Sequence, residues 1–123
     1  MTTNEIAKKY VALCKEGKHG EIIDTLFAKD AVSVEAAAPP GGGERISTGA
    51  KAIHEKGKHW GENNTIHKAE VFGPYPHDDR FAVRFSFDVT FKPQSRRFTM
   101  NEIGLFTVKD GKITKEEFFY TGM

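Results

Sequence analysis

The spacing of apolar residues in the first part of the chain predicts two amphipathic helices. Between residues 4 and 16 the apolar side chains recur at i, i+4, i+7 and i+8, which places them on one face of a helix. Gly17 stands where a left-handed residue commonly ends such a helix. A second, shorter helix is expected over residues 20–27, whose apolar positions again share a face.

A strand, a loop and a third helix are expected next. Residues 31–35 form a short segment rich in β-branched side chains, which favours a strand. Residues 39–43, a Pro-Pro-Gly-Gly-Gly run, suit neither helix nor strand and predict a surface loop. Ser47 or Thr48 is a suitable N-cap for a third helix, which the helical spacing of apolar residues carries to about Gly61.

The apolar period changes from about 3.6 to 2 in the second half of the chain, which indicates strands. Residues 65–72 form the first, ended by the Gly-Pro-Tyr-Pro segment, and residues 81–91 alternate strictly. Residues 98–108 and 113–120 are joined by an Asp-Gly hairpin turn. Long strands after a block of helices predict an α+β fold, with the helices covering one face of the sheet.

Composition narrows the class of protein. A length of 123 residues fits one domain, residues 1–123. The net charge of +1 gives no nucleic-acid footprint, and no apolar run is long enough to span a membrane. Without a visible secretory signal, and with Cys14 as the one cysteine, we expect a cytoplasmic protein. The absence of zinc spacing and of phosphate- or dinucleotide-binding glycine motifs leads us to expect no metal and no cofactor.

Several local segments, taken in order, resemble one known family. They are Tyr10-Val11-Ala12-Leu13, Leu26-Phe27-Ala28-Lys29-Asp30-Ala31, Thr48-Gly49-Ala50-Lys51-Ala52-Ile53, Val108-Lys109-Asp110-Gly111-Lys112-Ile113 and Glu116-Glu117-Phe118-Phe119-Tyr120. Together they resemble the SnoaL-like branch of the nuclear transport factor 2-like superfamily over nearly the whole chain. The resemblance implies a cone-shaped α+β barrel, in which three N-terminal helices pack on a curved, mostly antiparallel sheet of four to six strands. It also implies a homodimer built on the outer sheet face.

The resemblance does not imply one reaction. Ketosteroid isomerase, polyketide cyclases, hydratases, dehydratases and non-enzymatic subunits share this fold, so the site's own residues must argue for function.

Glu102 is the first candidate for chemistry. It is in phase with Phe98, Met100 and Phe106 on its strand. If that phase faces the concave side, burial raises the pKa of Glu102 toward the range of a general acid or base. The alternative is a carboxylate paired with a basic side chain or one at the solvated mouth of the cone.

Two further candidates come from the resemblance to ketosteroid isomerase. Aligned on that enzyme, Glu35 falls near the position of the catalytic base, and Tyr10 resembles the oxyanion-hole tyrosine on the first helix. Gly104 stands where the protonated acid of that enzyme would be, so the trio is incomplete. The alternative for Tyr10 is a core residue on a helix face.

His67 and a set of large apolar side chains complete the candidates. His67 is expected either to point inward beside Ala69 and Val71, near Glu102, or to face solvent or a dimer interface. An apolar wall for a flat ligand is expected from Trp60, Phe85, Phe87, Met100, Phe118 and Tyr120. The alternative is that these rings fill the core.

The sequence therefore supports a small-molecule pocket protein that takes an apolar or aromatic ligand. If it is an enzyme, it is a cofactor-independent isomerase, cyclase or lyase (dehydratase-type) that uses carboxylate acid-base chemistry. The alternative is a non-catalytic ligand-binding or dimeric accessory module.

Overall fold

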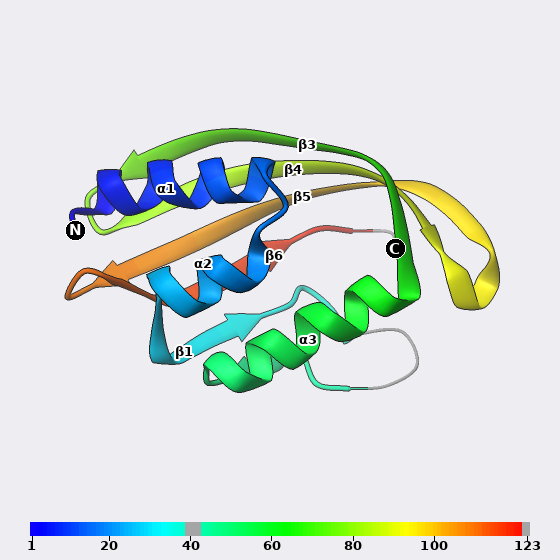
Figure 1. The fold of residues 1–123 in the computed structure, drawn as a ribbon, viewed down its shortest axis with the longest axis horizontal. Helices are drawn as coiled ribbons and strands as arrows, with labels where there is room; N and C mark the ends of the chain where they lie inside the picture. The colour runs from blue at the N-terminus through cyan, green and yellow to red at the C-terminus, as the bar shows by residue number, and fades with distance from the viewer. Residues whose placement is uncertain (39–42, 122–123) are drawn as a thin grey trace.

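The computed structural model describes residues 1–38 and 43–121. Three α-helices and six strands follow one another in these residues (Figure 1). They are α1 (Thr3–Lys15), α2 (His19–Leu26), β1 (Phe27–Val34), β2 (Ile46–Thr48), α3 (Ala50–Asn63), β3 (Asn64–His77), β4 (Arg80–Phe91), β5 (Arg96–Lys109) and β6 (Lys112–Phe119). A short 3-10 helix, η1 (Lys92–Gln94), lies between β4 and β5. The predicted 39–43 loop lies outside the described residues except for Gly43. No helix among the described residues is both long and apolar enough to cross a membrane.

All six strands form one open sheet in the order β2-β1-β6-β5-β4-β3. β1 runs parallel to β6, and the remaining neighbours are antiparallel. In Figure 1 the long strands β3 and β4 curve over α1, β5 runs between α1 and α2, and α3 lies beside β1. The α+β prediction, with helices on one face of a curved sheet, is confirmed.

The ends of α1 follow from local sequence chemistry. Thr2 and Glu5 form a capping box: the Glu5 amide donates to Thr2 Oγ1 (3.2 Å), and the Thr2 amide donates to Glu5 Oε1 (2.9 Å). At the other end Gly17 has φ +73°, and the Lys18 amide donates to the Leu13 carbonyl. This is a Schellman ending, so the helix stops at the predicted glycine.

Three predicted boundaries are wrong. The first strand begins at Phe27, where the second helix was expected to end, and not at residue 31. Ser47 and Thr48 do not cap α3, because they belong to β2 and pair with β1; Gly49, at φ +94°, precedes the helix. The Gly-Pro segment does not end β3. The strand continues to His77 by shifting its register against β4 between Phe72 and Tyr75.

The alternation predicted for β4 places the core. Phe81, Val83, Phe85 and Val89 are at most 3% exposed. Phe81, Val83 and Phe85 belong to one core cluster with Ile6 and Leu26 of the helices, which are fully buried. The opposite side of the sheet keeps polar and partly exposed apolar side chains, so the sheet has one covered face and one open face.

Candidate functional site

Strand register brings polar side chains onto the concave, covered face of the sheet. Glu102 on β5 pairs with Phe85 on β4, and Glu116 on β6 pairs with Ser33 on β1. Phe85, Ser33 and Glu116 are all buried, so this side faces the helices. Glu102 therefore points to the side that the sequence proposed for it.

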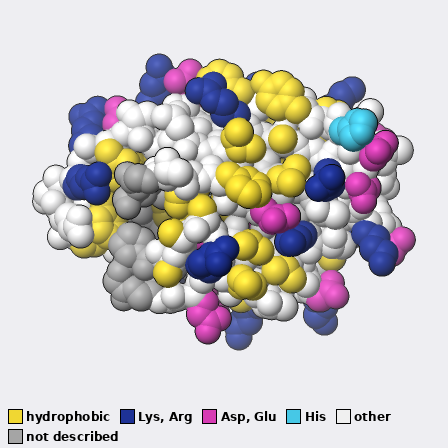
Figure 2. Space-filling view, turned by 180° about the vertical axis from the view of Figure 1, so that it is seen from behind, with side chains coloured by type: hydrophobic (Ala, Val, Ile, Leu, Met, Phe, Trp, Pro, Cys, Tyr) yellow, Lys and Arg dark blue, Asp and Glu magenta, His cyan; other side chains and the backbone are white. Residues whose placement is uncertain are grey.

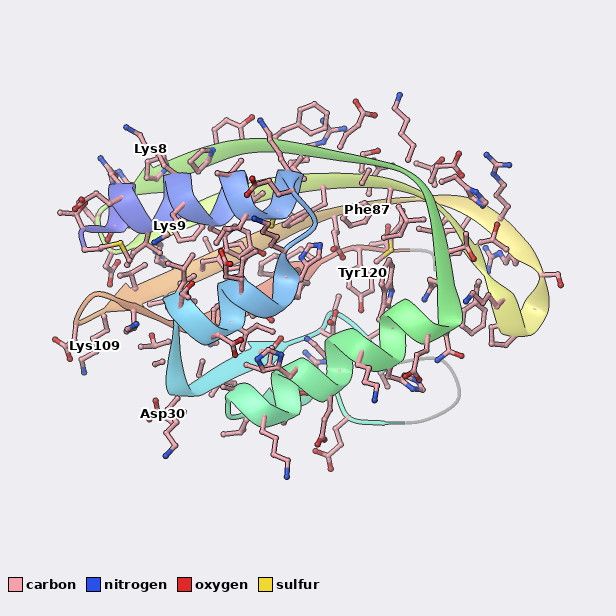
Figure 3. All side chains as sticks on the ribbon, viewed as in Figure 1. Lys8, Lys9, Asp30, Phe87, Lys109 and Tyr120 are labelled. Carbon is pink, nitrogen blue, oxygen red and sulfur yellow. The ribbon has the colours of Figure 1, made fainter. Side chains whose placement is uncertain are left out.

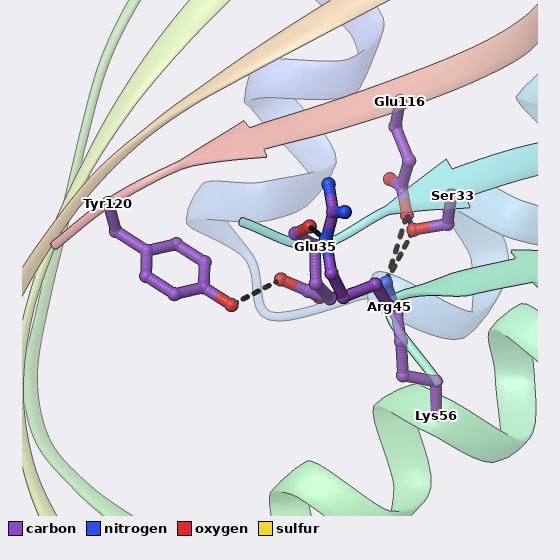
Figure 4. Close-up of polar contacts among 6 residues, drawn as sticks. All are labelled: Ser33, Glu35, Arg45, Lys56, Glu116 and Tyr120. Atoms are coloured by element: carbon purple, nitrogen blue, oxygen red, sulfur yellow. Dashed lines mark hydrogen bonds and ion pairs between the residues drawn. The ribbon is translucent and has the colours of Figure 1, made fainter. Parts of the chain in front are cut away.

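Glu35 is held from two sides just beyond the end of β1. Lys56 Nζ on α3 lies 2.9 Å from Glu35 Oε1, and the Tyr120 hydroxyl donates to Glu35 Oε2 over 3.0 Å (Figure 4). Arg45 Nε donates to the backbone carbonyl of Glu35 over 3.0 Å, which fixes the chain at this point. Both carboxylate oxygens of Glu35 thus have a donor.

Lys56 also joins Glu35 to a second carboxyl. Its ammonium donates to Ser33 Oγ, and the Ser33 hydroxyl donates to Glu116 Oε2 over 2.6 Å (Figure 4). Lys56 Nζ is itself 3.9 Å from Glu116 and 5.3 Å from the centre of the Phe118 ring. The result is a polar network that links α3 to β1 and β6.

Solvent reaches one end of this network. Ser33 is fully buried and Glu116 is 5% exposed. The side chains of Lys56 and Glu35 are 20% and 19% exposed. A surface hollow of about 400 Å³ adjoins Lys56 between β2 and α3. A ligand in this hollow therefore meets Lys56 without displacing the core.

Glu102 differs from its acidic neighbours because its side chain makes no hydrogen bond or ion pair with any described residue. Burial is the largest cause that raises its pKa, to about 7, and the negative charge of Glu35 adds to it. Lys56 acts in the opposite direction, and Glu116 raises the pKa further. A carboxyl with this pKa can donate or accept a proton near neutral pH.

Burial also raises the pKa of two other groups nearby, Glu116 and Tyr120. Burial raises the pKa of Glu116, against the opposing effects of Lys56 and the Ser33 hydrogen bond. Burial, with the charge of Glu35, raises the pKa of Tyr120 to about 12. The phenol therefore stays protonated and able to donate.

Aromatic rings form the apolar side of the site. Phe85 lies 5.8 Å from Phe87 and 6.5 Å from Phe118, between ring centres, and Trp60 lies 6.2 Å from Phe87. Trp60, Phe87, Phe118 and Tyr120 are partly exposed, while Met100 and Phe85 are buried. Phe87 and Tyr120 lie between the arch of long strands and α3 (Figure 3). Whether these rings bind a ligand stays a prediction.

Tyr10 lies in the core of the protein. Its ring is 4.4 Å from Phe106 and 5.7 Å from Phe81, and it is 5% exposed. Burial raises the pKa of the phenol well above its usual value, and the nearby Cys14 adds to the rise. Tyr10 is thus packed as a helix-face residue; nothing here tests a role in chemistry.

The inward orientation considered for His67 is wrong. The register of β3 against β4 shifts between Ile66 and Lys68, which takes His67 out of the alternation. Its exposed ring has Nε2 2.7 Å from Oγ1 of Thr90. His67 therefore faces solvent, which is the alternative that the sequence also allowed.

Gly104 explains why the isomerase-like trio is incomplete. A Cβ built on Gly104 would lie 2.8 Å from the Phe106 ring and 3.2 Å from the Phe118 ring. The two rings occupy the space that an acidic side chain would need, so this position excludes one.

Sequence reasoning missed three members of the network: Ser33, Lys56 and Glu116. Each had a usable signal. Lys56 is three residues after Ile53 and four before Trp60, on the buried side of α3. Ser33 is two residues from both Ala31 and Glu35, so the strand period places all three on one face. Glu116 shares a face with Phe118 and Tyr120 in the same way. The pattern could not show that β1 pairs with β6, which brings Ser33 beside Glu116, or that α3 places Lys56 against both.

No group of three or more His, Cys, Asp or Glu residues within residues 1–38 and 43–121 is arranged to hold a metal ion.

Comparison with known proteins places the whole chain in one structural group. A family model described as SnoaL-like domain matches residues 1–120. A Mesorhizobium loti protein, provisionally described as a SnoaL-like polyketide cyclase, is 44% identical, with a TM-score of 0.91 over 98% of this chain and 100% of that one. No curated protein matches.

Two more distant structures share the fold. An NTF2-like protein of Burkholderia thailandensis is 17% identical, with a TM-score of 0.84 over 98% of this chain and 92% of that one. A Bacillus subtilis protein, provisionally described as an isomerase, is 19% identical, with a TM-score of 0.76 over 98% of this chain and 90% of that one. Identities this low support the fold alone.

Proposed function

This chain belongs to the SnoaL-like domain family, and we propose that it is a small-molecule enzyme of the isomerase, cyclase or lyase kind that needs no cofactor. In this proposal Glu102 transfers a proton to and from an apolar substrate. One observation supports this proposal most. The Glu102 carboxyl lies on the covered face of the sheet and has no hydrogen-bonding partner among the described residues, whereas Glu35 and Glu116 both have one. The relative provisionally described as a polyketide cyclase supports the same class of chemistry.

The proton transfer follows from ordinary carbonyl chemistry. The Glu102 carboxylate takes a proton from a carbon next to a carbonyl group, and the electron pair left behind moves into the carbonyl to form an enolate. The protonated Glu102 then returns the proton to another carbon or to a leaving group. Because the pKa of Glu102 is about 7, both forms are present at neutral pH, which suits a group that must act as base and then as acid.

The aromatic side chains support an apolar substrate with a flat face. Trp60, Phe87 and Phe118 are only partly buried, and ring faces are favourable contacts for such a ligand. Lys56 and Tyr120 are the partly exposed donors on this side of the site. Tyr120 takes the role of polarising the substrate carbonyl, because Tyr10 is packed in the core and His67 faces solvent.

The test is exchange of carbon-bound hydrogen, followed by NMR in D2O with a panel of cyclic and aryl ketones. We expect exchange by the wild type on at least one ketone. Glu102→Gln should slow it by about 10²–10⁴, the usual contribution of a general acid or base. The matched control is Glu117→Gln, one residue from Glu116 and on the open face beside Lys115.

Equal exchange by Glu102→Gln and the wild type would remove Glu102 from the mechanism. If ketones bind, shown by shifts of the Trp60 indole signal, but none exchanges, the non-catalytic ligand-binding module is the better description.

We also propose that the protein is a homodimer through the open sheet face. Hydrophobic side chains gather across the middle of this face (Figure 2). Ile103 is 47% exposed, Phe119 51% and Tyr75 60%. Arg84 lies over the Phe72 ring at 4.6 Å and borders a hollow of about 250 Å³ with Ile103 and Phe119. An exposed apolar patch of this kind suits burial against a second copy.

A further inference from the structure

We propose that Lys56 is a positioning residue of this site: through direct contact with Glu35 and through Ser33 to Glu116, it holds two carboxyl groups in place, and its charge acts with theirs on Glu102. This inference rests on the proposed role of Glu102. Lys56 stands on α3, whereas the three acids stand on β5, on β6 and just after β1. Helix α3 therefore supplies the positive charge that lies beside Glu35 and Glu116.

The first step is the contact with Glu35. Lys56 Nζ is 2.9 Å from Oε1, and the Tyr120 hydroxyl donates to Oε2. Two donors, one of them charged, favour the ionised form of a carboxyl. Both oxygens of Glu35 are therefore held in place, and the negative charge of Glu35 raises the pKa of Glu102.

The second step passes through Ser33. The serine oxygen accepts from Lys56 while its hydroxyl donates to Glu116 over 2.6 Å. Glu116 thus gains a hydrogen bond oriented by the ammonium, although Lys56 Nζ is 3.9 Å away. Ser33 is fully buried, so a substrate cannot reach its hydroxyl, which excludes it as a nucleophile. Ser33 connects Lys56 to Glu116 by accepting one hydrogen bond and donating the other.

The third step concerns the other titratable groups around Glu102. Tyr10 and Cys14 face the site from α1, and Tyr120 follows β6. Burial raises the pKa of Cys14 to about 12 and that of Tyr10 well above its usual value, so both are uncharged at neutral pH, as is Tyr120. The charged groups that act on Glu102 are therefore Glu35, Glu116 and Lys56.

This arrangement has a signature that a purely structural lysine would not give. Loss of the Lys56 charge should raise the pKa of Glu102, because an attractive charge is removed. Loss of the Glu35 charge should lower it, because a repulsive charge is removed. The two changes break the same ion pair and yet should shift Glu102 in opposite directions.

The experiment is an NMR pH titration of the carboxyl carbons of ¹³C-labelled glutamate, with the Glu102 signal assigned by its loss in Glu102→Gln. We expect Lys56→Met to raise the pKa of Glu102 by about one unit, in the range of a nearby charge. Lys56→Arg should return it toward the wild-type value because the charge is kept. The matched control is Lys58→Met on the same helix, whose side chain is 79% exposed and pairs with Glu62; it should leave the titration unchanged.

Glu35→Gln is the second variant for the same titration, and it tests the inference on its own if Lys56→Met does not fold. We expect it to lower the pKa of Glu102 by a similar amount. An unchanged Glu102 titration in folded Lys56→Met overturns the inference, as does a rise in Glu35→Gln. These outcomes leave the ketone-exchange test untouched. An ordinary pKa for Glu102 in the wild type would instead contradict the proposed function itself.

Discussion

The burial of Glu102 lowers the stability of the folded protein when its carboxyl group is ionised, and it raises the pKa of that group to about 7. Placing an ionised carboxyl among aromatic rings is unfavourable, and a hydrogen-bonding partner usually compensates. Glu35 and Glu116 have such partners, whereas Glu102 has none among the described residues. An unpaired acid on a covered face is more typical of a functional position than of a structural one.

The stability of the protein should therefore depend on pH through Glu102. The folded state binds this proton with a pKa of about 7 and the unfolded chain with the usual value of 4.5. Because the folded state holds more protons between these values, the stability contribution is present below pH 4.5 and is lost as the pH rises through 7. A shift of this size corresponds to about 3 kcal/mol at most.

Urea denaturation at pH 5 and pH 8 measures this effect. The wild type should lose free energy of unfolding between the two, and Glu102→Gln should lose less of it, with Glu117→Gln as the control. The same pH slope in Glu102→Gln and the wild type would show that the carboxyl is solvated in the folded state.

Helices and strands were the features best predicted from the sequence. Strict alternation located β4, and the caps at Thr2 and Gly17 follow from local chemistry. Lys56 could not be assigned in the same way. Its side of α3 was predictable, but its partners are Glu35, just after β1, and Glu116 on β6, and these strands pair across some eighty residues of chain. Helical periodicity carries no information on such pairing.

Two glycines in different elements should respond in opposite ways to substitution by alanine. In β5, a Cβ at Gly104 meets the Phe106 ring at 2.8 Å, so Gly104→Ala forces the packed rings apart. We expect it to lower the free energy of unfolding by about 1–3 kcal/mol. In α3, Gly57 has nothing within 4 Å of the same atom, and Gly57→Ala should raise stability by up to about 1 kcal/mol.

Chemical denaturation of the two variants side by side provides the measurement, with each glycine as the control for the other. A stable Gly104→Ala would mean that the rings have room to move. An acidic side chain at the isomerase-like position would then no longer be excluded on steric grounds.

At the scale of the whole molecule, the sequence predicts which side chains lie on the open sheet face but not whether a second copy covers them. The strand alternation shows that this face carries side chains such as Ile103 and Phe119, and the structure shows them half-exposed. The pattern cannot distinguish a surface that tolerates exposed apolar groups from one that is covered in an assembly. Only association measured in solution makes that distinction.

If the open face is covered by a second copy, one charge placed on it should separate the protomers. We expect the wild type to have the mass of a dimer by light scattering, and its unfolding midpoint to rise with protein concentration, because association stabilises the folded state by mass action. Ile103→Glu should give a monomer whose midpoint no longer depends on concentration. Ile46→Glu is the matched control, since Ile46 is 51% exposed but stands on β2, at the far edge of the sheet. A monomeric wild type, or the same loss of mass in both variants, would contradict a dimer built on this face.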